Sequence, residues 1–288
     1  MNVDRYRVRM GDRRALARHR PGETGKFRHK HAALEQLRRG IERLEARQEL
    51  LYARGRHALL LIFQGMDASG KDSAITHVMS GVNPLGTDVH AFKRPSSEEL
   101  SHDYLWRAVK VLPARGRIGL FNRSYYEEVL VVRVHPELLA PQRLPAGSTA
   151  PPDLWEERYE DIVAFERYLR HNGTIVRKFF LHVSRSEQRK RLLERLDDPA
   201  KTWKFAAADI PERERWSGYM KAYTDALAAT STKQAPWYVI PADHKWFAHV
   251  LIAEIIVEAL DSLDLSPPEL SAAQKRENAE ARRRLNRE

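Results

Sequence analysis

The first feature that could do chemistry is a glycine-rich loop, Gly65-Met-Asp-Ala-Ser-Gly-Lys-Asp72, with the spacing G-x-x-x-x-G-K. Glycine allows the backbone bends that turn successive N–H groups toward one anion, and a following helix presents further free N–H groups. Lys71 adds a mobile positive charge for phosphate oxygens. The pattern predicts a phosphate-binding loop rather than an ordinary glycine-rich turn. Its candidate ligands are Gly65, Ala68, Ser69, Gly70, Lys71 and Asp72.

Two carboxylates belong to this loop. Asp72 occupies the position after the lysine, where such loops most often carry Ser or Thr, and Asp67 lies inside the loop. Carboxylates beside a phosphate site would repel the ligand unless a divalent cation lay between them. The sequence therefore predicts Mg²⁺, with Mn²⁺ as an alternative, bound through Asp67 and Asp72.

A second polar cluster follows the apolar run Gly119-Leu-Phe121. Asn122 and Arg123 come next, and the carboxyl ends of parallel strands are where such sheets meet their ligands. Arg123 could neutralise charge on a phosphoryl group during transfer. The alternative is a helix cap followed by a solvated arginine.

The elements that position these residues can be read from the hydrophobic pattern. Four apolar runs predict buried strands, at residues 57–64, 119–121, 174–183 and 237–240. An amphipathic helix is predicted from Leu34 to Leu51. Further helical patterns cover about residues 98–112, 154–171, 185–196, 211–231 and 244–263. Alternating strands and helices predict an α/β fold with a parallel central sheet covered by helices on both faces.

Composition narrows the classes of protein. The 288 residues are 42% hydrophobic and 31% charged, which excludes wholesale disorder, and no apolar run approaches the roughly 20 residues of a membrane span. Cysteine is absent, which excludes disulfides, thiolate zinc sites and a cysteine nucleophile and fits a cytoplasmic protein. The net charge of +10 is uneven, with +7 in residues 1–30 and +2 in residues 267–288. These basic ends could attract polyanions, or they could be merely solvated.

Further short motifs accompany the two polar stretches, in order along the chain. They are Asn83-Pro84, Phe92-Lys-Arg-Pro95, His102-Asp-Tyr-Leu-Trp-Arg107, Lys178-Phe-Phe-Leu-His182, Glu187-Gln188, Trp203-Lys204, Thr230-Ser-Thr232 and Ala235-Pro-Trp237. Together with Gln64-Gly-Met-Asp-Ala-Ser-Gly-Lys-Asp72 and Phe121-Asn-Arg-Ser-Tyr-Tyr-Glu127, they make the sequence resemble the polyphosphate kinase 2 family. The resemblance covers residues 30 to 262 without large gaps.

The resemblance implies a three-layer phosphate-loop kinase fold, similar to that of thymidylate kinases, with a helical lid. On this basis we expect a basic arm at residues 1–30, a kinase domain at 31–263 and a charged tail at 264–288. The expected lid covers about residues 197–232 of the domain.

The resemblance also implies an activity. Members move the terminal phosphoryl group between inorganic polyphosphate and a nucleotide, reversibly and with Mg²⁺, and often form homo-oligomers, here a dimer or a tetramer. By this likeness Asp67 would bind metal, Lys71 and the 67–72 backbone would hold phosphates, and Arg123 would act at the transfer point. Lys204 and Arg213 would lie on or near the lid.

The stretch Asn-Arg-Ser-Tyr-Tyr-Glu-Glu-Val-Leu is most similar to the third class of the family, whose members phosphorylate both AMP and ADP. Members restricted to ADP tend to have Asn in place of Glu127. We expect the carboxylate of Glu127 to organise a metal ion or water near the shorter acceptor. Many relatives carry Asp where this chain has Asn122, which argues against a direct metal contact there.

A polyphosphate donor carries about one negative charge per phosphate and needs a long basic track. The candidates are Lys71, Lys93, Arg94, Arg117, Arg123, Arg133, Arg177 and Lys178. Any one of them could instead be a solvated surface charge. The expected partners are inorganic polyphosphate and adenine nucleotides, with guanine nucleotides as an alternative, and neither a membrane nor a specific nucleic acid.

Two other functions fit parts of the pattern. A kinase that uses ATP as the donor would have a similar loop, although it would usually carry Ser or Thr in place of Asp72. A noncatalytic module that binds polyanions through the basic arm would not need Lys71, Asp67 and Arg123 together.

Overall fold

The four predicted apolar runs and one further strand form a five-stranded parallel sheet in the computed structural model, which describes residues 1–145, 147–148 and 150–287. The strands are β1 (Ala58–Gln64), β2 (Thr87–Ala91), β3 (Ile118–Asn122), β4 (Thr174–His182) and β5 (Trp237–Pro241). Their order is β2-β3-β1-β4-β5, and every residue of β1 is buried. A central strand covered on both faces needs such an apolar run, so the α/β prediction is confirmed.

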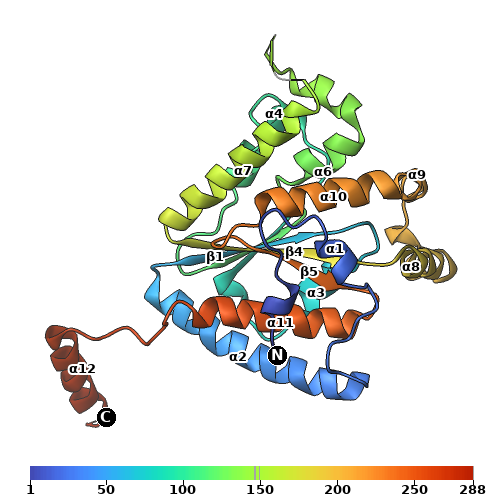
Figure 1. The fold of residues 1–288 in the computed structure, drawn as a ribbon. Helices are drawn as coiled ribbons and strands as arrows, with labels where there is room; N and C mark the ends of the chain where they lie inside the picture. The colour runs from blue at the N-terminus through green and yellow to red at the C-terminus, as the bar shows by residue number, and fades with distance from the viewer. Residues whose placement is uncertain (146, 149, 288) are drawn as a thin grey trace.

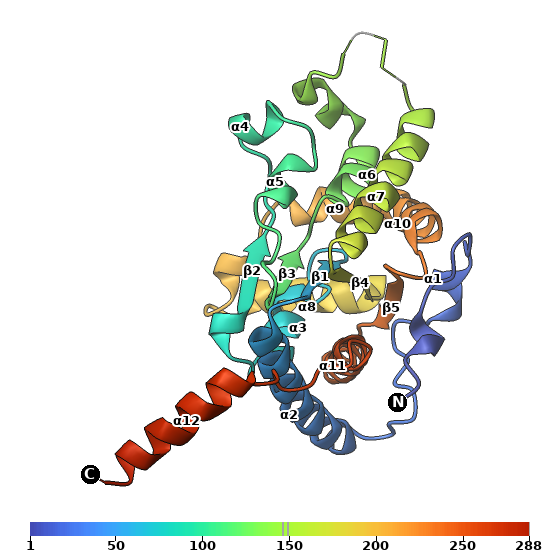
Figure 2. The same ribbon diagram turned by 90° about the vertical axis from the view of Figure 1, so that its left-hand side faces the viewer.

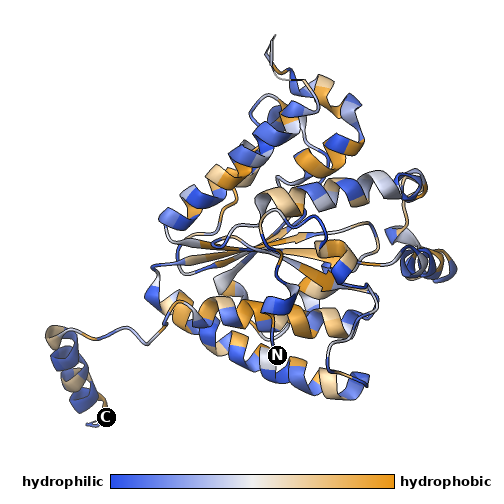
Figure 3. Ribbon diagram, viewed as in Figure 1, coloured by the Kyte–Doolittle hydropathy of each residue, from blue (hydrophilic) through white to orange (hydrophobic). Residues whose placement is uncertain are grey.

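Helices cover both faces of the sheet and make three layers (Figure 1). On one face lie α2 (Lys30–Arg54), α3 (Lys71–Val78) and α11 (Lys245–Asp261). On the other lie α6 (Glu127–Val134), α7 (Asp153–His171) and α10 (Trp216–Thr230). Figure 3 shows apolar residues concentrated in the sheet and α11, with hydrophilic residues on the outer helix surfaces. The hydrophobic core therefore occupies the two seams between the layers.

The strand order reverses direction at β1, and this creates the site. From β1 the chain moves to β2 and β3 on one side and later to β4 and β5 on the other. Phe63 of β1 is paired with Asn122 of β3, and the backbone N–H of Arg123 donates to the Phe63 carbonyl at 2.9 Å. The loop after β1 and the polar end of β3 are therefore neighbours, at the place where open α/β sheets bind ligands.

Several elements differ from the sequence expectations. Strand β2 was not predicted because it is a half-exposed edge strand without an apolar run. The helical pattern at 98–112 divides into α4 (Ser97–Leu100) and α5 (Trp106–Val109), where the Asp103 carboxylate accepts from the Leu105 N–H and turns the chain. The pattern at 211–231 divides into α9 (Asp209–Glu214) and α10, and α6 was missed. The remaining elements are α8 (Arg185–Asp197), η2 (Pro84–Gly86), η3 (Pro136–Gln142) and η4 (Thr202–Lys204).

The two ends of the chain behave differently. The first residues carry η1 (Asp4–Tyr6) and α1 (Ala15–Arg18), and the side chains of Val3, Tyr6 and Val8 are buried. The Val8 N–H donates to the Trp237 carbonyl at 2.8 Å, so this arm lies along β5 despite its charge. The tail forms the exposed helix α12 (Ala272–Leu285), which projects away from the domain (Figure 2). Residue 288 of the predicted tail lies outside the described residues.

A histidine pair joins α3 to α11. The rings of His77 and His249 are stacked with centroids 4.6 Å apart, and His249 Nε2 lies 3.4 Å from the hydroxyl of Ser73. Burial, together with the nearby His77, Lys245 and Arg191, lowers the pKa of His249 to about 4. The folded state therefore disfavours a proton that the unfolded chain accepts near its ordinary pKa of 6.5.

This difference in pKa predicts that stability is lost as the pH falls from about 6.5 to 4, because the unfolded state then binds more protons at this site. His249→Gln should reduce the difference between the free energies of unfolding at pH 7 and pH 4.5, measured by urea titration. His171→Gln, on the exposed end of α7, is the control and should leave the difference unchanged. An equal pH dependence in all three proteins would contradict the prediction.

Candidate active site

The loop between β1 and α3 adopts backbone angles that its glycines favour and that Ala68 does not. A Cβ atom on Gly65 would lie 2.7 Å from the Ser69 hydroxyl and 2.9 Å from the Leu181 carbonyl, so a side chain does not fit there. Gly70 caps α3 with a φ of 104°, and Ala68 adopts a φ of 58°. Positive φ angles within a short loop are typical of backbone nests that bind anions. Ala68 is strained in this conformation, which persists where the surroundings hold it.

Lys71 lies inside the loop that it serves. Its ammonium group donates to the carbonyl oxygens of Gly65, at 2.7 Å, and Met66, at 3.2 Å. Its side chain is buried, and burial, with the nearby Arg123, lowers its pKa to about 8. The charge is thus kept at the base of the loop, where a phosphate could compete with the two carbonyls for its hydrogen bonds.

Arg123 connects the loop to the end of β3. It adopts a φ of 64°, and its guanidinium donates to Asp67 at 2.6 Å and to Glu127 at 3.0 Å. The carboxylates of Glu127 and Asp67 raise its pKa against the effect of burial. A non-glycine residue with positive φ beside such a cluster is the kind of strain that collects at functional sites.

Asn122 also reaches the loop, through a hydrogen bond to one of the loop carboxylates. Its side-chain amide donates to the carboxylate of Asp72 at 2.6 Å. A carboxylate at this position would face Asp72 with a like charge. The amide therefore suits a loop in which Asp72 replaces the usual Ser or Thr.

Two cavities meet at this cluster, and Phe92, Lys93 and Arg123 line both. The phosphate-loop cavity, lined by residues 67–73, has a volume of about 680 Å³, and the mixed cavity, lined by Tyr104, Glu127 and Gln142 among others, about 720 Å³. Arg123 thus belongs to the wall that the two spaces share. The segment 201–212 borders both cavities with different residues. Lys201, Trp203, Lys204 and Asp209 line the phosphate-loop cavity, and Ala208 and Glu212 line the other.

The phosphate-loop cavity is strongly basic. Four Asp or Glu side chains line it, against eight Lys or Arg side chains: Lys71, Lys93, Arg123, Arg191, Arg195, Lys201, Lys204 and Lys245. Trp203 is at the mouth with 77% of its surface exposed, and the ammonium of Lys204 lies 5.0 Å from its ring centroid. Such a lining favours a ligand with several negative charges.

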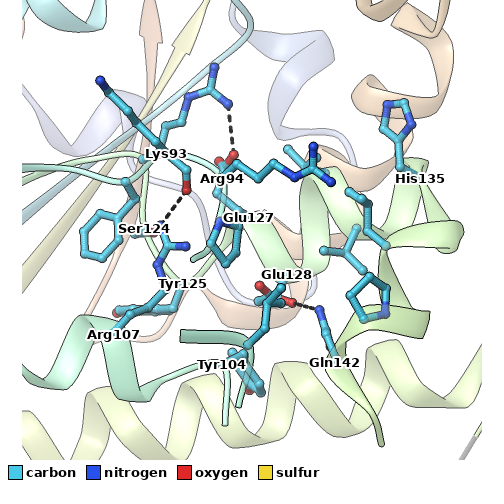
Figure 4. A pocket seen from close by; sticks show the side chains of 18 of the residues that line it. Lys93, Arg94, Tyr104, Arg107, Ser124, Tyr125, Glu127, Glu128, His135 and Gln142 are labelled. Carbon is cyan, nitrogen blue, oxygen red and sulfur yellow. Dashed lines mark hydrogen bonds and ion pairs between the residues drawn. The ribbon is translucent and has the colours of Figure 1, made fainter. Parts of the chain in front are cut away.

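The mixed cavity is lined by both apolar and charged side chains (Figure 4). Apolar and aromatic side chains form much of it, including Phe92, Leu100, Tyr104, Val131 and Leu138. Arg94 and Glu127 add charge, and the side chain of Gln142 donates to Glu128 at 2.7 Å. The Tyr104 hydroxyl is buried and makes no hydrogen bond to the described residues. This combination of apolar surface with a few polar groups is typical of small-molecule sites.

The loop carboxylates are suited to a hard cation. Among the described residues, no group of three or more His, Asp or Glu side chains could hold a metal ion by itself. Mg²⁺ is commonly bound through one or two carboxylates together with substrate phosphates and water. Asp67 and Asp72 both line the phosphate-loop cavity, so they fit that mode of binding.

Four predicted phosphate ligands do not line either cavity, and for the fully buried Lys178 the prediction was wrong. Lys178 is fully buried, and its ammonium is bonded to Glu166 at 2.5 Å, to the Tyr126 hydroxyl and to the Thr230 carbonyl. The others are held by neighbours away from both cavities. Arg133 pairs with Asp225, Arg117 with Asp88, and Arg177 donates to the Val176 and Gln234 carbonyls.

Arg213 is a fifth case, because it lies on α9 but does not line either cavity. Its guanidinium donates to the Arg185 carbonyl and to the side-chain oxygen of Gln188 on α8. Arg213 thus contacts α8 rather than either cavity, and the lid at residues 197–232 stays a prediction.

Sequence reasoning also missed residues that line the phosphate-loop cavity. Arg191 and Arg195 lie on α8 after β4, and Lys245 begins α11 after β5. Their signal was available, because polar residues that follow parallel strands reach the ligand edge of the sheet. Asp209, whose pKa is raised by burial and by Asp67, is brought in only by the fold.

The family model described as polyphosphate kinase 2 matches residues 28–267. The chain belongs to the polyphosphate kinase 2 family. It is 52% identical over 251 residues to an ADP-polyphosphate phosphotransferase of Rhodopseudomonas palustris, covering 87% of each chain. It is 46% identical over 275 residues to an AMP/ADP-polyphosphate phosphotransferase of Meiothermus ruber, covering 95% of this chain and 98% of the relative.

A solved structure supports the same fold. The crystal structure of polyphosphate kinase 2 from Arthrobacter aurescens TC1 superposes with a TM-score of 0.85 at 39% identity, covering 95% of this chain and 94% of that one. The expected phosphate-loop kinase architecture is thus that of the polyphosphate kinase 2 family. The finer likeness to thymidylate kinases stays a prediction.

Lys178 offers a test of its structural role. Burial is the largest influence on both partners, raising the pKa of Glu166 and lowering that of Lys178, while their ion pair acts against it. Lys178→Met would leave Glu166 unpaired in the core and should lower the free energy of unfolding by about 3–5 kcal/mol. Lys178→Met with Glu166→Gln should lose less.

Urea unfolding measures these losses, and Lys190→Met on the exposed face of α8 is the matched control. The folded fraction of the Lys178 variant should keep the KM for polyphosphate of the unaltered protein. Unchanged stability with a raised KM would restore Lys178 as a phosphate ligand.

Proposed function

We propose that the protein transfers the terminal phosphoryl group of inorganic polyphosphate to ADP and to AMP. The observation that carries the proposal is the position of Arg123 in the wall shared by a basic cavity and a mixed cavity. Membership of the polyphosphate kinase 2 family and the names of its relatives support it.

The donor would occupy the phosphate-loop cavity. Polyphosphate is a chain of anions, and the excess of basic side chains along this cavity matches it better than it matches a single phosphate. Lys71 and the loop N–H groups would hold the terminal phosphates, while Lys201, Lys204 and Lys245 would contact the following ones. Added salt should weaken binding of such a donor steeply.

The acceptor nucleotide would occupy the mixed cavity. Its base would contact the apolar wall that includes Phe92, Tyr104 and Leu138, and its phosphates would extend toward Lys93, Arg94 and Arg123. The terminal phosphate oxygen of the acceptor would then face the terminal phosphorus of the donor. Adenine is the expected base, and guanine remains an alternative occupant.

In the transfer step, an acceptor phosphate oxygen forms a bond to the terminal phosphorus of polyphosphate. At the same time, the bond between that phosphorus and the bridging oxygen breaks. The shortened polyphosphate keeps that oxygen, and the same step run backward makes the reaction reversible. Arg123 would neutralise charge on the moving phosphoryl group, after its ion pairs with Asp67 and Glu127 loosen. Holding both substrates in line contributes the rest of the catalysis.

Asp67 and Asp72 would hold Mg²⁺, or Mn²⁺ as an alternative, beside the donor phosphates. The cation would reduce repulsion between the carboxylates and the phosphates and would stabilise charge in the transition state. Asp67 accepts from Arg123 and Asp72 accepts from Asn122, so both carboxylates are already oriented by hydrogen bonds.

The use of AMP rests on narrower ground. The relative from Rhodopseudomonas palustris is named for ADP alone, whereas the one from Meiothermus ruber is named for AMP and ADP. Glu127 lines the mixed cavity and pairs with Arg123, and in this proposal its carboxylate would organise a water or metal near a shorter acceptor. Assembly as a dimer or tetramer and a cytoplasmic location stay predictions. None of the described helices is long and apolar enough to cross a membrane.

The first test is an assay of the purified protein with Mg²⁺, polyphosphate and either AMP or ADP, followed by nucleotide chromatography. We expect ADP and ATP from AMP, ATP from ADP, and a loss of at least about 100-fold in kcat for Asp67→Asn. Phosphorylation of a small acceptor by ATP, with no transfer from polyphosphate, would instead indicate an ATP-dependent kinase. Binding of polyphosphate without any transfer would indicate a noncatalytic module.

The second test separates the two acceptors. Glu127→Asn should reduce kcat/KM for AMP by at least about tenfold more than for ADP, because only the shorter acceptor needs the carboxylate to complete its site. Glu127→Gln, which keeps the side-chain length, should behave in the same way. If AMP and ADP turnover both stay unchanged, or both fall equally, Glu127 does not select the acceptor.

A further inference from the structure

Helix α8 holds the phosphate loop from behind. The side-chain amide of Gln188 donates to the Asp67 carbonyl at 2.9 Å. The guanidinium of Arg191 donates to the carbonyls of Ala68, at 3.1 Å, and Ser69, at 3.0 Å. Three consecutive carbonyls of the loop are therefore bonded by two side chains that lie one helical turn apart.

These contacts determine where the loop N–H groups point. The carbonyl and the N–H of one trans peptide unit point in opposite directions. Drawing the carbonyls of Asp67 and Ser69 toward α8 turns the N–H groups of Ala68 and Gly70 the other way, toward the phosphate-loop cavity. The N–H of Ser69, between them, donates to the Met66 carbonyl at 3.1 Å and closes the loop. The nest that would bind the donor phosphates thus depends on hydrogen bonds that hold the loop carbonyls on the side facing α8.

Arg191 is itself held in place from several directions. Its second terminal nitrogen donates to the carbonyls of Ala242, at 2.6 Å, and Asp243, at 2.9 Å, just after β5. Glu187 accepts from its Nε at 2.9 Å, and only 5% of the residue is exposed. A buried arginine that donates to four carbonyls ties the loop after β1 to the segment after β5, two strands away in the sheet. It also offsets the strain of Ala68, whose positive φ needs support from its surroundings.

Gln188 has a second partner on the segment that borders both cavities. Its side-chain oxygen accepts from Arg213 of α9 at 2.8 Å, and Arg213 also donates to the Arg185 carbonyl at 2.7 Å. The fully buried Gln188 thus connects α9 to the Asp67 carbonyl through one amide group. A displacement of α9 would disturb the hydrogen bond from Arg213 to the amide oxygen of Gln188. It would thereby also disturb the hydrogen bond from the amide nitrogen of Gln188 to the Asp67 carbonyl.

We propose that Gln188 and Arg191 are positioning residues that hold the phosphate loop in its anion-binding form, and that Arg213 couples α9 to the loop through Gln188. The inference rests on the proposed function, because it assigns these residues to the donor half of that reaction. Neither residue needs to touch the phosphoryl group that moves.

Gln188→Met tests the role of the amide, since methionine has a similar volume and no hydrogen-bonding group. With tripolyphosphate and Mg²⁺ as the probe, calorimetry should show a dissociation constant raised by about 10- to 100-fold, the range expected when a ligand group is displaced slightly. The KM for polyphosphate should rise while the KM for ADP stays within about twofold. Amide hydrogen exchange in residues 66–71 should become faster.

Lys190→Met is the matched control, because it lies between Gln188 and Arg191 in sequence but its side chain is exposed. It should change none of these quantities. A role in packing alone would lower the melting temperature of Gln188→Met and leave the tripolyphosphate affinity of the folded protein unchanged, and that result would overturn the proposal. Arg191→Lys provides a second variant that keeps the charge. A single ammonium cannot reach four carbonyls, so its affinity for tripolyphosphate should also fall.

The coupling to α9 is tested by a double-mutant cycle. If Arg213 acts through Gln188, then Arg213→Met should weaken tripolyphosphate binding in the unaltered protein and have little further effect in Gln188→Met. Additive losses would overturn the coupling. Failure of the unaltered protein to bind tripolyphosphate, or to use polyphosphate as a donor, would overturn the proposed function instead. Normal activity with an unaffected Gln188 variant would overturn only this inference.

Discussion

The pairing of β1 with β3 is the constraint on which the rest of the site depends. Because Phe63 is in register with Asn122, the strand that ends in the glycine-rich loop lies beside the strand that ends in Arg123. Two segments fifty or more residues apart in the chain are thereby joined by direct contacts, from Asn122 to Asp72 and from Arg123 to Asp67. A change of register would separate these pairs, whatever the local sequence.

Charge at this junction is balanced in a way that suits an anionic ligand. The carboxylates of Asp67 and Glu127 accept hydrogen bonds from Arg123, and backbone carbonyls accept from Lys71. Each positive group therefore has a partner that a phosphate could replace. The same carboxylates are available to a cation once phosphates have drawn Arg123 away, so the substrates and the metal would exchange partners with groups that are already in position.

The basic residues of the chain fall into two kinds that sequence alone does not distinguish. Lys71 and Lys178 follow or lie in neighbouring strands, and both were predicted to meet phosphate. Lys71 is at the ligand edge of the sheet, whereas Lys178 lies in mid-strand among apolar residues and pairs with Glu166 from α7. The difference is set by depth along the strand and by a partner that is distant in sequence. The only clue in the local sequence was whether each lysine lies within an apolar run or just after one.

The sequence by itself determined the layered α/β architecture, the phosphate loop and the membership of the polyphosphate kinase 2 family, because each depends on local spacing and burial pattern. The sequence predicted four of the five strands and missed β2, because an edge strand needs no continuous apolar run. Only the tertiary structure decided which arginines and lysines line a cavity and which are tied up elsewhere. It also revealed α8 behind the loop, where Gln188 and Arg191 bind three loop carbonyls. Such contacts join segments more than a hundred residues apart, and their geometry exists only after the strands have paired.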